Sequence, residues 1–382
     1  MIGQRGVPAT RGGIERHVEE LGARLVQRGH EVTVFCRTSY VAGGAPEYRG
    51  MQLRYLPSLD SKHLEALSHS LVCSLATLGK GFDIVHFHAL GPGLFTPLPR
   101  WLSRAKVVQT VHGRDDQRAK WGMVARSVLR TAGWMSARVP DATITVSRDL
   151  QVFYQQRYQR RTDYIPSGVV PPAPHAAGAE VARLGLRPRQ YLLFVGRLVP
   201  EKAPDLLIRA FRALEDDVRL VIVGGSSHST DYVGRLEALA GEDPRVSMVG
   251  YQYGDSLAEL YTNAAAFVLP SSLEGLPLTL LEGAASGLPI VASNIPPHLE
   301  VLGSDDRPGR RIFPVGQREE LLSALQRVLR DPPAEHRAAE AFARDVVAIY
   351  QWDATAEKTL AVYDRLLGGN GFSTKDVAVA TE

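Results

Sequence analysis

Short apolar runs alternate with amphipathic helical stretches along most of the chain, and this rhythm constrains the fold more than any other feature. The runs are "EVTVFC", "DIVHFH", "KVVQTVH" and "ATITV" in the first half, and "YLLFVG", "VRLVIVG", "VSMVG", "AFVLP" and "PIVAS" in the second. Continuous apolar runs separated by helices are typical of parallel strands that are covered on both faces. The pattern therefore predicts doubly wound α/β sheets.

Two domains are predicted, because the segment over residues 164–180 is rich in Pro, Gly and Ala, as linkers are. With 382 residues, 45% of them hydrophobic, the chain can bury two cores. The predicted parts are an N-terminal domain over 1–168, a C-terminal domain over 169–345, a helix over 346–367 and a disordered tail over 368–382. Only Met1 and Ile2 precede the first glycine, so we expect an incomplete first strand and a late or truncated start.

Composition narrows the class of protein. No run approaches about 18 apolar residues and no basic–apolar leader is visible, so neither a membrane span nor a secretion signal is predicted. Cys36 and Cys73 lack metal-ligand spacing and fit reduced core thiols, which favours the cytoplasm. Residues 1–168 hold 23 Lys and Arg against 13 Asp and Glu, a balance of +10, and the remainder holds 21 against 28, or −7. The two halves are therefore suited to different partners.

Ligands of open parallel sheets bind beyond the carboxyl ends of the strands, so binding residues are expected in the strand-end loops. In "VGRLVPEK", Arg197 and Lys202 precede a helix that we expect to begin near Ala203. Two cations beside a helix N-terminus favour an anion such as a diphosphate. The alternative is a pair of solvated surface charges.

A second loop, "SSLEGLPLTLLEGAASGLP", places Glu274 before a turn and Glu282 inside a helix that opens near Thr279. This spacing fits a nucleotide-sugar site, where one carboxylate accepts hydrogen bonds from sugar hydroxyls and the other from a ribose. The free amides of Leu278 and Thr279 would then face phosphate. The alternative is a glutamate that complements the helix dipole and a second one that is solvated.

Two further loops carry weaker signals. Gly12 and Gly13 would let a loop approach a phosphate closely, although a plain turn is equally compatible, and the dinucleotide fingerprint G-x-G-x-x-G is missing. His86, His88 and His112 end two strands, but a fourth ligand or an acidic partner is not patterned, so no metal is predicted. His112 better suits a contact to a substrate hydroxyl, and packed or capping histidines are the alternative for the others.

Together these residues resemble a retaining glycosyltransferase of glycosyltransferase family 4. The most specific parts are the E-x7-E element from Glu274 to Glu282 and "GRLVPEK" from Gly196 to Lys202, and the resemblance covers nearly the whole chain. "GQRGVPATRGGIERHVEEL", "HFHALGP" and "YIPSGV" are similar to a bacterial, rhamnosyltransferase-like subgroup from polysaccharide gene clusters. The resemblance implies a GT-B fold, in which two doubly wound Rossmann-like domains face each other across a cleft.

The implied reaction is hexosyl transfer from a nucleotide-diphosphate sugar, with the donor held mainly by the C-terminal domain and the acceptor by the N-terminal one. The resemblance assigns the diphosphate to Arg197 and Lys202, the donor sugar to Glu274, and the ribose to Glu282. The amides of Leu278 and Thr279 complete the donor site.

The resemblance also assigns roles outside this cluster. Gly13 lets the first loop close over the phosphates, His112 lies near the reacting sugar, and Tyr251 belongs to the loop "GYQYG" that brackets the base. The final helix matches a segment that crosses back onto the first domain. Retention is implied to occur by same-face attack, with the departing phosphate taking the acceptor proton. No Asp-x-Asp metal site is apparent, so no metal and no cofactor are predicted, and cationic side chains stabilise the leaving group instead.

The basic half also suggests an acceptor. The stretch over 114–138 has six Lys and Arg against two Asp, and its apolar residues are Trp121, Val124, Val128, Leu129 and Trp134. A basic helix with such a face can lie on an anionic bilayer, which predicts a peripheral enzyme on the cytoplasmic face and a polyprenyl-diphosphate sugar as acceptor. Alternatively these residues pack against the sheet.

Other functions remain open at this point. A soluble small-molecule acceptor, a sugar-nucleotide 2-epimerase and a non-catalytic nucleotide-binding protein are compatible with the same architecture. A Rossmann-type oxidoreductase is disfavoured by the missing fingerprint, and no nucleic-acid partner is predicted.

Overall fold

The computed structural model describes residues 1–10, 12–40, 44–59, 64–114, 116, 122–171, 173, 175–225 and 230–368. The chain divides into two compact units: unit 1 is Met1–Gly168 with the segment from Trp352 onward, and unit 2 is Val169–Gln351. The return to unit 1 comes later than residue 346, because helix α13 (Pro332–Ile349) runs through that position and α14 begins at Trp352. The predicted tail, from residue 369 on, lies outside the described residues.

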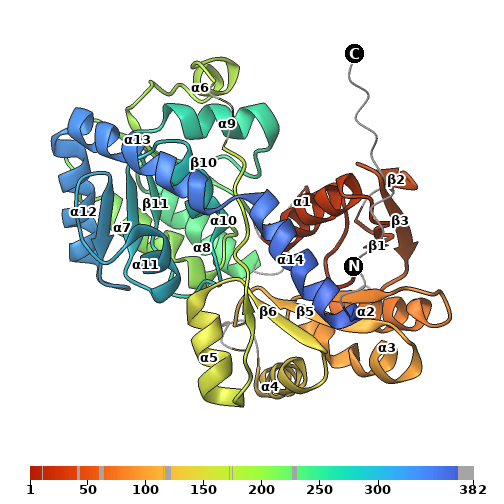
Figure 1. The fold of residues 1–382 in the computed structure, drawn as a ribbon. Coiled ribbons are helices and arrows are strands. Elements are labelled where there is room, and N and C mark those ends of the chain that lie inside the picture. Colours follow the sequence, from red (N-terminus) through yellow and green to blue (C-terminus); the bar gives the residue numbers. More distant parts are fainter. Residues whose placement is uncertain are drawn as a thin grey trace, which may run out of the picture. The chain divides into compact units, whose positions relative to one another are not determined.

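Unit 2 is a six-stranded parallel sheet with helices between its strands (Figure 1). Its elements are α6 (Ala179–Arg183), β8 (Tyr191–Val195), η3 (Pro200–Lys202), α7 (Pro204–Phe211), β9 (Arg219–Val223), α8 (Thr230–Gly241), β10 (Val246–Met248), α9 (Gly254–Asn263), β11 (Ala266–Leu269), α10 (Leu278–Ala285), β12 (Ile290–Ser293), α11 (Pro296–Leu302), β13 (Arg310–Phe313), α12 (Arg318–Arg330) and α13. The strand order is β10-β9-β8-β11-β12-β13, so the chain starts in the middle of the sheet and reverses direction between β8 and β11.

This order explains why the strands are apolar throughout. Every residue of β8, β11 and β12 is buried. Crossovers between parallel strands are right-handed, so the reversal places α7 and α8 on one face of the sheet and α10 on the other. A strand that is covered on both faces needs apolar side chains at consecutive positions, as the sequence shows.

A buried carboxylate holds the first segment of unit 2 in place. Glu259 in α9 accepts hydrogen bonds from the backbone amides of Gly178 at 2.8 Å, Glu180 at 3.3 Å and Val181 at 2.7 Å. These amides open α6 and have no helical acceptor of their own. Burial alone would raise the pKa of Glu259, but the three amides outweigh burial and lower it. Glu259 therefore attaches the segment that follows the linker to the body of unit 2.

Unit 1 contains the first thirteen labelled elements of the chain and the last. They are α1 (Gly13–Gln27), β1 (Thr33–Arg37), β2 (Glu47–Tyr48), β3 (Met51–Leu56), α2 (Glu65–Thr77), β4 (Ile84–His88), η1 (Gly91–Phe95), α3 (Pro97–Leu102), β5 (Lys106–Val111), α4 (Met123–Arg138), β6 (Ala142–Thr145), α5 (Arg148–Tyr158), β7 (Asp163–Tyr164) and α14 (Trp352–Leu367). The strands form two ladders, β1-β3-β2 and β4-β5-β6-β7.

Met1 and Ile2 connect these two ladders. The amide of Phe35 in β1 donates to the carbonyl of Met1 at 3.1 Å, and the amide of His88 in β4 donates to the carbonyl of Ile2 at 2.7 Å. The two residues therefore lie between β1 and β4 and complete a continuous sheet. Ile2 is fully buried.

The two faces of this sheet have separate cores. Val34 and Cys36 of β1 pack with α1 and α14, whereas Phe35 packs with α2 on the opposite face. Alternation along a strand has a period of two, so His86 and His88 share one face of β4. That face carries α1 and α14, which contact each other in Figure 1. The pleat thus directs both histidines toward these helices.

All nine strands expected from the apolar runs are present, with slightly different ends. The sequence did not predict β2, β7 and β13, which are short, lie at sheet edges and are rich in charged or polar residues. It also did not predict β3, which has six residues and alternates buried and exposed positions over its first four. In the described part of the chain, no helix is both long enough and apolar enough to cross a bilayer.

Candidate functional site

The candidate donor site lies at the reversal point of the unit 2 sheet. Loops that follow β8 and β11, the two central strands, leave the same edge in opposite directions, and this is where open α/β sheets bind ligands. The loop after β8 carries Arg197 and Lys202, and the loop after β11 carries Glu274. The backbone amide of Ser272 donates to the carbonyl of Glu201 at 2.9 Å and joins the two loops.

Lys202 and Glu274 form an ion pair across this point. Only 13% of the lysine side chain and 9% of the glutamate side chain are exposed, so the pair is largely shielded from water. Ser271 Oγ donates a second hydrogen bond to the glutamate at 2.8 Å. Burial alone would raise the pKa of Glu274, but Lys202, His298 and Ser271 together hold it below its ordinary value. The carboxylate is therefore ionised at neutral pH.

A buried polar network behind the pair was not predicted. His298 is fully buried, and its Nδ1 lies 2.9 Å from the carbonyl of Ser293 and 3.1 Å from the Ser293 hydroxyl. Burial lowers the pKa of His298 to about 4 although Glu274 opposes the shift, so the ring is neutral. Both carboxylate oxygens of Glu201 are also buried without a hydrogen-bond partner among the described residues. Ser293 and His298 lie in β12 and α11, outside the motifs that directed the sequence prediction, whereas Glu201 lies inside "GRLVPEK" but was not singled out there.

The N-terminus of α10 presents the donors that the sequence suggested. α10 begins at Leu278, after Pro277, and within the described residues no acceptor pairs with the amides of Leu278 and Thr279. The Thr279 hydroxyl is likewise buried without a partner there. Two amides, a hydroxyl and the positive end of the helix dipole together favour an anion.

Glu282 lies one turn further along α10 and is held by a buried phenol. Tyr261 OH donates to Glu282 Oε2 at 3.1 Å. Burial, followed by the charge of Glu282, raises the pKa of Tyr261 well above its ordinary value, so the phenol remains a donor. The two glutamates thus differ in environment: Glu274 is paired with a cation, and Glu282 accepts a neutral hydrogen bond.

Glycines bring the neighbouring strand-end loops into contact. Gly224 has a φ of 137°, and a Cβ there would lie 1.8 Å from the carbonyl oxygen of Gly196. The amide of Gly224 donates to the carbonyl of Gly250 at 2.8 Å. Tyr251 follows, 37% exposed, with its ring stacked on Tyr253 at a centroid distance of 6.0 Å. A flat, accessible aromatic surface therefore lies next to the loop of Arg197.

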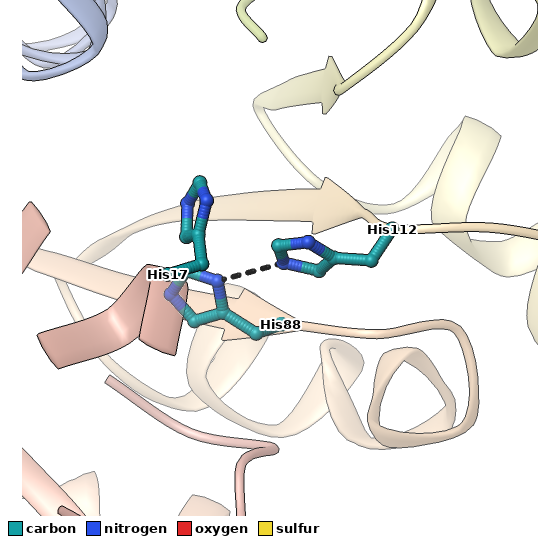
Figure 2. Close-up of side chains that lie close together, drawn as sticks. All are labelled: His17, His88 and His112. Atoms are coloured by element: carbon teal, nitrogen blue, oxygen red, sulfur yellow. Dashed lines mark hydrogen bonds between the residues drawn. The ribbon is translucent and has the colours of Figure 1, made fainter. Parts of the chain in front are cut away.

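Unit 1 contains a cluster of histidines. His88 Nδ1 and His112 Nε2 lie 3.3 Å apart, and the ring of His17, from α1, lies edge-on to His112 at a centroid distance of 4.7 Å (Figure 2). His17 Nδ1 is 2.9 Å from Ser167 Oγ. The sequence prediction did not include His17, whose signal was only its place in the helix after the glycine loop.

His86 differs from these three histidines in its hydrogen bonds. Its Nδ1 lies 2.6 Å from Tyr363 OH in α14 and its Nε2 lies 2.7 Å from Thr110 Oγ1, so both ring nitrogens are engaged. Burial, with smaller effects from neighbouring imidazoles, lowers the pKa of His17 and His88 well below 6.5 and that of His112 to about 3. These rings are neutral at physiological pH.

Gly13 is the first residue of α1, and Gly12 before it has a φ of 95°. A side chain at Gly12 would lie 2.2 Å from Glu15 Oε2. Glu15 accepts from the amide of Arg5 at 3.0 Å and Glu19 accepts from the amide of Ala9 at 2.6 Å. The glycine loop is therefore attached to the first turns of α1, with Gly13 at the helix N-terminus.

The predicted apolar face of α4 is wrong as stated. Leu129 is only 8% exposed and packs inside unit 1, whereas Trp134 is 54% exposed. These positions are five residues apart, about 140° around the helix. The exposed face contains Met123, Arg126, Arg130, Trp134 and Arg138 instead. Val128 is half-buried, and Trp121 and the side chain of Val124 lie outside the described residues.

A pocket lies beside the carboxyl end of β5, directly after His112. Its lining includes Gly113, Arg114, Asp116, Phe153 and Tyr158. The Arg114 guanidinium lies 4.1 Å from the centroid of the Phe153 ring. The pocket thus combines an aromatic wall with charged groups of both signs.

The architecture and the positions of these residues define a class of protein. Two Rossmann-like units, with the candidate residues at strand ends, have the GT-B architecture of glycosyltransferases. Comparisons with known proteins agree: residues 11–171 match the family described as "Glycosyltransferase Family 4", and residues 182–345 match "Glycosyl transferases group 1". The chain is therefore a glycosyltransferase built from a family 4 domain followed by a group 1 domain.

Individual relatives are more distant. A GDP-mannose-dependent alpha-(1-6)-phosphatidylinositol monomannoside mannosyltransferase of Mycolicibacterium smegmatis is 28% identical over 75% of this chain and 78% of that protein. An alpha-maltose-1-phosphate synthase of Mycobacterium tuberculosis is 26% identical over 96% of this chain and 98% of that protein. The structure of Anabaena HepE in complex with UDP and glucose has a TM-score of 0.77 at 16% identity, covering 94% of this chain and 97% of HepE. That structural similarity concerns the fold alone.

Proposed function

We propose that this glycosyltransferase moves a hexosyl group, with retention, from a nucleotide-diphosphate sugar to an acceptor. The observation that carries the proposal is the pairing of Lys202 with buried Glu274 at the reversal point of unit 2, at the same sheet edge as the free amides of α10. A cation and helix amides bind a diphosphate, and a carboxylate binds sugar hydroxyls. The GDP-mannose-dependent relative and the UDP complex of HepE support a nucleotide donor.

The leaving group is stabilised by fixed positive groups. Negative charge grows on the diphosphate as the glycosidic bond breaks, and Arg197, Lys202 and the amides of Leu278 and Thr279 are donors of the required kind. Lys202 is already oriented by Glu274, so its ammonium is fixed before the donor binds. No metal or other cofactor is needed in this scheme, because the side chains supply the positive charge.

The remaining donor contacts follow from the two glutamates and the tyrosine. Glu274 accepts hydrogen bonds from the donor sugar, and Glu282 accepts them from the ribose hydroxyls. Tyr251 offers its exposed ring to the base. In unit 1 we assign His112 to a hydroxyl of the reacting sugar, and Gly13 to close approach of the first loop to the phosphates.

Retention fits the absence of an assigned enzymic nucleophile: the acceptor attacks from the face that the diphosphate leaves, and the departing phosphate takes the acceptor proton. Burial lowers the pKa of His112 to about 3, so its neutral ring is a weak base. Its neutral ring is suited instead to hold a hydroxyl by a hydrogen bond. The proton therefore leaves with the phosphate.

For the acceptor we propose a polyprenyl-diphosphate sugar at the cytoplasmic face of an anionic membrane. The exposed face of α4, with Trp134 at 54% and Met123 at 87% exposure between Arg126, Arg130 and Arg138, has the composition of an interfacial helix. The pocket after His112 includes Arg114, which suits a charged acceptor. A soluble acceptor is the second candidate, because one relative is an alpha-maltose-1-phosphate synthase.

The test is a screen of UDP-, GDP-, ADP- and dTDP-sugars by thermal shift and hydrolysis, followed by transfer to polyprenyl-linked and soluble acceptors. We expect one nucleotide family to stabilise the protein and an α-configured donor to give an α-linked product. A 2-epimerase would convert the donor without an acceptor, which would contradict the proposal. Binding of a nucleotide without turnover toward any acceptor or water would indicate a non-catalytic protein.

A further inference from the structure

The histidine cluster of unit 1 has a geometry that hydroxyl binding does not require. One ring nitrogen from each of His17, His88 and His112 lies within 4.8 Å of the other two. They come from α1, the end of β4 and the residue after β5, so helix packing and the pleat of the sheet bring them together (Figure 2). We propose that these three imidazoles form a site for a divalent transition metal ion such as Zn²⁺.

The distance between His88 and His112 supports this proposal. Two nitrogens bound tetrahedrally to zinc at about 2.0–2.1 Å are roughly 3.3–3.4 Å apart, and His88 Nδ1 and His112 Nε2 are 3.3 Å apart. Both nitrogens can therefore ligate one ion with little movement. One of these two nitrogens carries the proton of their hydrogen bond. When the metal binds, that ring changes tautomer, and the proton moves to the second nitrogen of the same ring without being lost.

His17 would supply the third ligand. Because Ser167 Oγ engages His17 Nδ1 at 2.9 Å, Nε2 of this ring remains for the metal. A hydrogen bond to the second ring nitrogen is the usual way in which proteins orient a metal-binding histidine. His86, whose two nitrogens are both engaged, stacks on His88 at a centroid distance of 4.3 Å and restricts the movement of that ring.

The second nitrogen of His88 is free to take up the ring proton. His88 Nε2 is buried and has no hydrogen-bond partner in the part of the chain that the structure describes. With Nδ1 on a metal, Nε2 carries the proton, and the ring needs no change of charge. Neutral imidazoles bind zinc, copper and nickel in preference to magnesium or calcium. Three ligands leave a fourth position open for water or an anion.

The ion would take His112 as a ligand, and the proposed function has the same ring bind a hydroxyl of the donor sugar. Metal binding and sugar binding would then compete for one ring, and zinc would inhibit transfer reversibly. This consequence rests on the proposed function, whereas the metal site itself does not. The three histidines belong to unit 1 and the diphosphate residues belong to unit 2, so a metal-independent transfer reaction is compatible with the site.

The test uses the full-length, untagged protein after removal of metals, with Zn²⁺ titrated by calorimetry and Co²⁺ as a spectroscopic probe. We expect one ion per chain, the visible bands of tetrahedral cobalt, and no binding of Mg²⁺. His17→Gln removes a ligand and should lower zinc affinity by more than the roughly 10–100-fold that loss of an outer hydrogen-bond partner costs. The matched control is His30→Gln, a half-buried histidine of the same unit outside the cluster, which should leave the affinity unchanged.

Absence of saturable zinc binding, or equal affinity in His17→Gln and wild type, would overturn the proposal. If His17→Gln fails to fold, Ser167→Ala provides a milder test, since it removes only the hydroxyl that orients His17; affinity should fall about 10–100-fold. Transfer is measured separately, with zinc and then with a chelator. Zinc binding that depends on His17 but leaves transfer unchanged would refute the role of His112 in transfer, while the metal site would stand.

Discussion

The buried ion pair between Lys202 and Glu274 allows a prediction that separates structure from catalysis. Lys202→Met keeps most of the side-chain volume and removes the charge, so that within the described residues the Ser271 hydroxyl is the direct hydrogen-bond partner left to Glu274. Breaking a buried pair in this way typically destabilises by about 3–5 kcal/mol. We expect a loss of this size in unit 2 at neutral pH.

A second estimate comes from protonation. The variant can avoid a buried charge by protonating Glu274, whose ordinary pKa is 4.5. At about pH 7.5 this costs about 4 kcal/mol, from three pH units at about 1.36 kcal/mol each. In the wild type the pKa of Glu274 is lowered, so the stabilisation is present above pH 4.5 and is lost as the pH falls below it. The difference between wild type and Lys202→Met should therefore shrink toward pH 4.5.

The assay is urea unfolding followed by circular dichroism and by tryptophan fluorescence. All four tryptophans of the chain belong to unit 1, so the fluorescence transition is an internal control that should not move. Arg209→Met breaks the more exposed pair with Asp205 and should cost less than about 1 kcal/mol. The double variant Lys202→Met/Glu274→Gln should recover most of the stability.

Two results would refute this reasoning. One is a Lys202→Met protein that unfolds like wild type at pH 7.5, and the other is a double variant no more stable than the single one. Catalysis is measured where all variants are folded. There Lys202→Met should lose about 2–4 kcal/mol of transition-state stabilisation, or about 30- to 1000-fold in rate, and the double variant should not recover it.

Three further predictions concern other parts of the chain. Glu274→Gln should mainly lower kcat, because Glu274 contacts the sugar that moves in the reaction. Glu282→Gln should mainly weaken nucleotide binding, measured by calorimetry. Equal losses of nucleotide affinity in the two variants would show that these roles are wrong. Glu259→Ala should lower the free energy of unfolding by about 1–3 kcal/mol, since three amides lose a charged acceptor, with unchanged nucleotide affinity; an unaltered unfolding curve would contradict the capping role. Co-sedimentation with vesicles should need anionic lipid, weaken in Trp134→Ala, and fall as salt approaches a few hundred millimolar, where the Debye length is below about 8 Å. Binding to neutral vesicles alone, or to neither kind, would favour a soluble acceptor.

The fold class was predictable from the sequence because its signals are local. Runs such as "YLLFVG" and "AFVLP" are apolar at consecutive positions since both faces of those strands are covered, and this requirement acts on each strand separately. The rule that ligands bind beyond strand ends then directs attention to Arg197, Lys202 and Glu274 without knowledge of strand order. Likewise α10 begins where the Gly-Leu-Pro turn predicts.

Tertiary structure decided which of these residues meet. Lys202 and Glu274 are 72 positions apart, and they pair because β8 and β11 become neighbours at the reversal of the sheet, which no local pattern specifies. His86 and His88 look equivalent in "DIVHFH", yet α14, returning from the far end of the chain, engages His86 through Tyr363, while α1 brings His17 to His88. Likewise, Leu129 is buried and Trp134 is exposed because one face of α4 packs inside unit 1 and the other does not, which the sequence did not specify. Periodicity shows that a side chain has a buried or an exposed position, but its partners are set by contacts between segments distant in sequence, and those exist only once the chain has folded.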